Sequence, residues 1–180
     1  MAEPWLRGTL TEFDSVRRQV LHGLELAVED ANRWCAGLTD LQIHVMPGGC
    51  SSVTFHLRHA SASLDRLLTY AEGRQLSAVQ LEELAEEKEP LGGVRDVLDD
   101  FRSGLLEAAE RICFFQPQSY EEQRFVGRER IPSTVGALLI HCAEHTQRHI
   151  GQAITTASIV SARANPCVEF NGARARWIRE

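Results

Sequence analysis

Histidines are concentrated in two short stretches of this 180-residue chain, and the longer stretch has a helical spacing. His141, His145 and His149 follow one another at intervals of four residues. Side chains at positions i, i+4 and i+8 of an α-helix lie along one stripe. Two imidazoles one turn apart can bind a single ion, and neutral imidazole is a good ligand for zinc, nickel, copper and ferrous iron. This stretch therefore predicts a site for a divalent transition metal.

The second stretch contains His56 and His59, and it supplies a third ligand if its helix faces the helix of the first stretch. Three protein ligands with one open position are typical of catalytic rather than structural zinc sites. His56 lies nearer the centre of the apolar face of its helix and His59 nearer the edge, so the spacing alone leaves open which of them binds. The competing interpretation is a set of core histidines that only form hydrogen bonds. Burying several polar rings without partners is costly, which favours a shared metal.

Four long segments must position these histidines, and each repeats apolar residues at steps of three and four, which is typical of amphipathic helices. The segments span about residues 10–38, 51–72, 94–115 and 134–161. A short acidic helix is expected over 77–88. Residues 116–131 are expected to be an irregular connection without strands, in which residues 125–127 can lie extended against the bundle. The pattern predicts an all-α fold, a four-helix bundle that comprises residues 1–161. Residues 162–180 form a tail to which the pattern assigns no structure.

Several other polar residues have an ordinary structural interpretation beside a functional one. Cys142 precedes His145 by three residues, so it is either a small core residue or a thiol near the metal. Glu144 and Arg148 flank the ligands, where surface residues are more common than a catalytic acid or an anion clamp. The acidic helix is expected to be a solvated face. Its glutamates are Glu82, Glu83, Glu86, Glu87 and Glu89.

Composition excludes some classes of partner. The formal net charge is −6, whereas nucleic-acid-binding proteins usually carry a basic patch. No segment approaches the roughly 18 consecutive apolar residues of a membrane span, and the first residues lack the pattern of a signal peptide. Five cysteines are an odd number without framework spacing, which favours free thiols. We therefore expect a cytoplasmic protein that binds neither nucleic acid nor membrane.

Two motifs together resemble the DinB-like superfamily. Residues 52–59, Ser-Val-Thr-Phe-His-Leu-Arg-His, continue into a helix that resembles the first metal-ligand helix of that family. Residues 144–152, Glu-His-Thr-Gln-Arg-His-Ile-Gly-Gln, resemble its last-helix signature. The resemblance covers about residues 10–160 and implies a four-helix bundle, often dimeric, with a divalent metal on three histidines.

Matching the motifs residue by residue implies that the metal ligands are His59, His145 and His149. His59 is chosen over His56 because the small residue Ala60 follows it, as in the family. His56 and His141 then become candidates for orienting a ligand or the substrate.

The resemblance also implies a class of function. We expect a metal-dependent enzyme that acts on a small-molecule substrate, either a hydrolase or a transferase that uses a low-molecular-weight thiol such as mycothiol or bacillithiol. Zinc or nickel is the expected metal. The alternative is a non-catalytic metal- or ligand-binding protein that serves as a sensor or in a stress response.

A homodimer is expected because relatives are often dimers and because the N-terminal region carries apolar residues off its core stripe. These are Leu6, Val16, Leu21 and Val28. Such residues can form a contact patch. The alternative is that the tail covers this surface within one chain through its own apolar residues, which are Val168, Phe170, Trp177 and Ile178.

Overall fold

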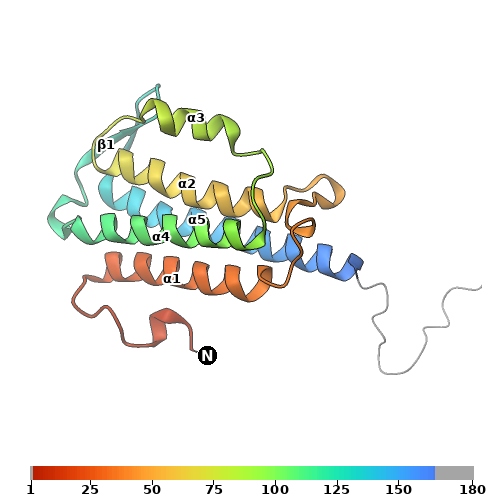
Figure 1. Cartoon of the computed structure of the whole chain (residues 1–180). Coiled ribbons are helices and arrows are strands. Elements are labelled where there is room, and N and C mark those ends of the chain that lie inside the picture. Colours follow the sequence, from red (N-terminus) through yellow and green to blue (C-terminus); the bar gives the residue numbers. More distant parts are fainter. Residues whose placement is uncertain (1, 165–180) are drawn as a thin grey trace, which may run out of the picture.

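Four long helices form a bundle in the computed structural model, which describes residues 2–164 (Figure 1). The four helices are α1 (Ser15–Cys35), α2 (Val53–Ala71), α4 (Val94–Phe114) and α5 (Val135–Ala164). Both α1 and α2 pack against α4 and α5. This arrangement confirms the predicted all-α four-helix bundle and places the two histidine stretches on neighbouring helices.

Capping residues determine where the long helices begin. The Asp14 carboxylate accepts hydrogen bonds from the backbone N–H groups of Val16 and Arg17, and Ser52 caps α2 through the N–H of Phe55. Such caps satisfy N–H groups that have no partner within the helix. The first helix therefore begins at Ser15 and not near residue 10 as predicted. Short 3-10 turns precede or connect the helices, at Pro4–Leu6, Gln42–His44, Pro47–Gly49 and Pro117–Ser119.

A β-hairpin stands where the sequence was predicted to be an irregular connection. Strands β1 (Gln123–Val126) and β2 (Ile131–Thr134) pair antiparallel, and the turn between them begins at Gly127 with a φ of 70°. The prediction of no strands was wrong here because four-residue strands give too little alternation to be recognised. The N–H of Val135 donates to the carbonyl oxygen of Glu122, so the hairpin is joined to the first turn of α5.

The short helix α3 (Ala78–Glu86) is held against α2 by polar contacts. Ser77 and Gln80 form a reciprocal capping box at its start. The amide of Gln80 also donates to Asp65 Oδ2 at 2.5 Å and to Thr69 Oγ1 at 2.8 Å on α2. Figure 1 shows α3 and the hairpin on the side of α2 that faces away from α1. The start of α3 is thereby fixed beside the second helix.

The core contains most residues of the predicted apolar stripes, with some exceptions in α1. Trp34, near the end of α1, is 45% exposed. Leu21 was expected on an outer patch but is only 7% exposed and belongs to the core, whereas Leu6 is 59% exposed. The four apolar residues expected to form a dimer contact are therefore not one continuous exposed patch. The homodimer stays a prediction.

The end of the bundle extends slightly beyond the predicted boundary. Helix α5 continues to Ala164, whereas the sequence predicted its end near residue 161. The tail from residue 165 onward, including its expected covering role, lies outside the described residues. Among the helices over residues 2–164, none combines the length and apolarity needed to cross a membrane.

Candidate metal centre

The facing surfaces of α2 and α5 bring together the three histidines that the motifs assigned as ligands. One nitrogen from each of His59, His145 and His149 lies within 4.8 Å of the other two. The ring centroids are 4.5 Å apart for His59 and His149, 4.6 Å for His145 and His149, and 5.2 Å for His59 and His145. All three side chains are partly buried. We call these three residues the histidine triad.

Two rings of the triad are held through their Nδ1 atoms. His59 Nδ1 lies 2.6 Å from Glu87 Oε2, and His149 Nδ1 lies 3.2 Å from His56 Nδ1. Histidine ligands of metals almost always form such a bond through the nitrogen that does not face the metal, because it fixes the tautomer and the ring orientation. The Nε2 atoms of both rings are therefore the candidates for metal coordination. Ser63 Oγ lies 3.3 Å from Nε2 of His59.

Glu87 is a buried part of this site, and the prediction that it belongs to a solvated face was wrong. The residue is 5% exposed, and its second oxygen lies 2.5 Å from Arg66 Nη1. Burial raises the pKa of the carboxyl, but hydrogen bonds from His59 and Arg66 outweigh it, so the net pKa is lowered. Glu87 lies two turns after Gln80, the other buried residue of this segment. A search for apolar periodicity misses this pair because both are polar.

The protonation state of the triad suits metal binding. Burial, aided by the neighbouring His59, lowers the pKa of His145 and that of His149 to about 4. Both rings are therefore neutral near pH 7, which is the form that binds metals. In addition, His145 Nδ1 is buried and has no hydrogen-bond partner among residues 2–164. An orphaned buried nitrogen beside two other imidazoles fits a divalent transition metal.

The two remaining candidates lie next to the triad and not within it. His56 contacts His149, as described above, and burial lowers its pKa. The His141 ring lies 5.5 Å from the His145 ring, and its Nδ1 lies 3.3 Å from Glu144 Oε2. Both positions are compatible with orienting a ligand or a substrate.

Three flanking residues lie where the sequence favoured placing them, on the surface or in the core. Glu144 and Arg148 are exposed and pair with each other at 3.0 Å on the surface of α5. Cys142 is fully buried in the core, and burial raises the pKa of its thiol to about 12. It is therefore a core residue and not a metal-proximal thiolate.

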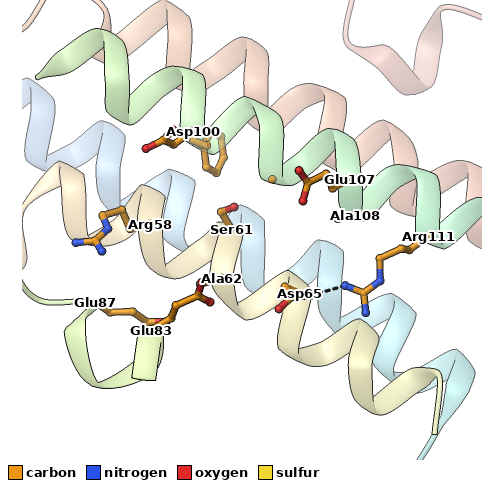
Figure 2. A pocket seen from close by; sticks show the side chains of 12 residues that line it. Arg58, Ser61, Ala62, Asp65, Glu83, Glu87, Asp100, Glu107, Ala108 and Arg111 are labelled. Atoms are coloured by element: carbon orange, nitrogen blue, oxygen red, sulfur yellow. Dashed lines mark hydrogen bonds and ion pairs between the residues drawn. The ribbon is translucent and has the colours of Figure 1, made fainter. Parts of the chain in front are cut away.

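A separate charged pocket lies between α2, α3 and α4, and the sequence did not predict it. Its volume is 380 Å³, and Figure 2 shows side chains of α2 and α4 facing each other across it. Asp65 and Arg111 form an ion pair of 2.5 Å at one end. Glu87 also lines this pocket, so one buried carboxylate lies between the pocket and the histidine triad.

Comparison with known proteins supports the fold and the family. One solved structure with a similar fold is YfiT from Bacillus subtilis, described as "a probable metal-dependent hydrolase with an unusual four-helix bundle topology". It is 14% identical in sequence, and the alignment covers 81% of this chain and 87% of that chain with a TM-score of 0.60. None of the curated proteins matches the sequence. The model of the DinB superfamily matches residues 23–153, which is more than half of the chain and includes the whole triad. The chain belongs to the DinB superfamily.

Proposed function

We propose that this protein is a divalent-metal-dependent hydrolase of a small-molecule substrate, with the metal held by His59, His145 and His149. The observation that carries the proposal is the convergence of three imidazoles from two helices within 4.8 Å, in a position that is only partly buried. Partial exposure leaves access for a substrate, which a closed structural site does not need. The description of YfiT as a probable metal-dependent hydrolase supports hydrolysis as the reaction class.

The chain's own residues prepare the triad for this role. When bound, zinc or nickel would act as a Lewis acid that polarises a substrate carbonyl and makes water or a thiol a better nucleophile. Glu87 holds the ring of His59, and Arg66 holds Glu87 in turn. His56 holds the ring of His149. These contacts fix the ring orientations before a metal or substrate arrives.

His141 is our candidate for moving a proton. A positioned imidazole can act as a general acid or base. The His141 ring lies at the rim of the triad and is partly exposed, so a bound substrate can reach it. Glu144 orients the ring through Nδ1, which leaves Nε2 for the proton of the nucleophile or of the leaving group.

A thiol-dependent transferase is the second candidate, and the positions of the cysteines bear on the source of its reacting thiol. Within residues 2–164, no cysteine belongs to the triad or contacts it through a hydrogen bond, and Cys142 is buried with a raised pKa. For this second candidate we therefore propose a low-molecular-weight thiol as the cosubstrate. Both candidates use the same metal site and differ only in the nucleophile.

Metal analysis followed by a turnover screen tests these candidates. Protein purified without a histidine tag and without chelator is expected to carry close to one divalent ion per chain. It is then incubated with panels of esters and amides, with and without low-molecular-weight thiols. Turnover in water alone supports the hydrolase, and turnover only with a thiol supports the transferase. A tightly bound metal without any turnover would favour a non-catalytic sensor instead.

A further inference from the structure

A groove that is distinct from the charged pocket lies beside the histidine triad, between the β-hairpin and the first turns of α5. It has a volume of 630 Å³ and is lined mainly by apolar side chains. Leu67 comes from α2, Val126 and Ile131 from the hairpin, and Leu138 and Ile140 from α5. Its size lies within the range of about 300–1,000 Å³ that is usual for small-molecule sites.

The groove reaches His141, the neighbour of the triad on α5. His141 and Glu144 belong to its lining, and the ring of His141 lies 5.5 Å from the ring of His145. Leu138 precedes His145 by seven residues, which corresponds to about 10 Å along a helix axis. A molecule of moderate length can therefore lie in the groove and place one end at the triad.

Two of the lining side chains are unusually exposed for their type. Ile131 and Ile140 are each 57% exposed, and they come from strand β2 and helix α5, respectively. Exposed apolar surface next to a polar centre is typical of a ligand site, because the apolar wall supplies affinity and the few polar groups supply orientation. The charged pocket on the other side of α2 lacks this combination.

We propose that this groove binds the apolar part of an amphipathic substrate whose polar reacting group lies at the histidine triad. The inference rests on the proposed function and adds the substrate class to it. The substrate is an ester, amide or related compound that carries an aliphatic or aromatic segment about 10 Å long. A small, fully polar substrate would leave the groove empty and gain nothing from it.

Binding of a hydroxamate series to the zinc-loaded protein tests the proposal without depending on turnover. Hydroxamates bind metal through the head group whatever reaction the enzyme catalyses. Isothermal titration calorimetry compares acetohydroxamate, hexanohydroxamate and octanohydroxamate. We expect hexanohydroxamate to bind at least about tenfold more tightly than acetohydroxamate, since each buried methylene contributes a factor of about three to four.

Variants of the two exposed isoleucines test whether the groove causes the dependence of hydroxamate affinity on chain length. The double variant Ile131→Asn/Ile140→Asn is expected to remove the chain-length dependence while acetohydroxamate binds as before. Ile159→Asn is the matched control, because Ile159 is a partly exposed isoleucine of α5 that lies outside the groove. Equal affinity for all chain lengths, or a dependence that survives the double variant, would overturn the proposal.

A second measurement separates failure of the groove from failure of the metal site. Binding of anilinonaphthalene sulfonate to metal-free protein is expected to decrease in the double variant and not in Ile159→Asn. If no hydroxamate binds but this difference is present, the metal-dependent function fails and the apolar groove stands. If light scattering shows that the double variant converts a dimer into a monomer, the groove is a subunit contact and the substrate proposal is wrong.

Discussion

Helix α2 has a polar cluster on two of its faces, and the two clusters differ in how completely they are paired. Toward α4, Arg111 donates to Asp65 Oδ1 at 2.5 Å and to Glu72 Oε1 at 2.7 Å. Its remaining nitrogen reaches Thr69, which also accepts from Gln80. Toward α5, the triad leaves His145 Nδ1 without a partner within residues 2–164.

The comparison distinguishes a structural polar cluster from a candidate ligand site. Around Arg111, cations and carboxylates satisfy one another, so no further ion is needed. The pKa of Glu72 illustrates this: burial raises it, but hydrogen bonds from Arg111 and Arg74 outweigh burial and lower it. The triad contains three imidazoles and no carboxylate of its own, and it gains most from an added cation. Glu87 lies between the two clusters and serves the triad.

The largest effect is expected when two triad residues are replaced together. The variant His145→Gln/His149→Gln should lose tight metal binding completely, because only one imidazole remains. Helical content by circular dichroism should stay close to that of the wild type, since both side chains are partly exposed. His44→Gln is the control, because His44 lies outside the triad and should leave one ion per chain bound. A double variant that still binds one ion tightly would contradict the assignment of His145 and His149 as metal ligands.

The two histidines of α2 should differ in their contribution to metal affinity. His59→Ala removes a proposed ligand and should weaken zinc binding by more than 100-fold, beyond the roughly 10- to 100-fold effect of losing an orienting residue. His56→Ala removes only the partner of His149 Nδ1 and should stay within that smaller range. Competition with a chromogenic chelator measures both. If His56 proves the larger contributor, the motif alignment is displaced by one turn.

Replacing the carboxylate behind His59 should give an intermediate effect. Glu87→Gln keeps the size of the side chain but removes the charge that holds His59 Nδ1 at 2.6 Å. We expect zinc affinity to fall roughly 10- to 100-fold. Glu83→Gln is the matched control, because Glu83 is an exposed residue of α3 that precedes Glu87 by four residues and is not part of the triad. Equal affinities of the two variants would show that Glu87 has no role in the site.

The opposite cluster should affect stability and not metal binding. Arg111→Met removes the hydrogen bonds to Asp65 and Glu72, and we expect the free energy of unfolding to fall by about 2 kcal/mol. Urea denaturation measures this change, and zinc affinity should be unaltered. Arg74→Met is the control, because Arg74 pairs with the same Glu72 from an exposed position. This substitution should lower the free energy of unfolding by less than Arg111→Met does. A loss of zinc affinity in Arg111→Met would contradict the separation of the two clusters.

The last prediction concerns the pH dependence of the stability of the metal-free protein. The pKa values of His145 and His149 are lowered to about 4 from the ordinary value of 6.5, so between these values the unfolded state binds more protons than the folded state. The contribution of these two histidines to the free energy of unfolding is therefore complete above pH 6.5 and is lost as the pH falls toward 4. Thermal unfolding at several pH values measures the loss. The unfolding temperature of the variant His145→Gln/His149→Gln should decrease less than that of the wild type over the same pH range. If the unfolding temperatures of both proteins decrease equally, the lowered pKa values are contradicted.

Features that depend on local spacing could be predicted from the order of the residues alone. The four helices follow from apolar periodicity and from caps such as Ser52, and the His145–His149 pair follows from a spacing of one helical turn. The choice of His59 over His56 needed the family resemblance, because both lie close to the same helix face. Positions of this kind can be predicted because neighbouring residues on one helix fix their own geometry.

Features that depend on contacts between distant segments became apparent only in the folded chain. Glu87 was expected in solvent, yet α3 is held against α2 by Gln80, and this packing buries the Glu87 carboxylate beside His59. The β-hairpin and its groove arise in the same way, from two short strands joined to the start of α5. The burial of a polar residue cannot be recognised from apolar periodicity in the sequence. Its position is decided by charge pairing and hydrogen bonds that exist only once the helices have packed.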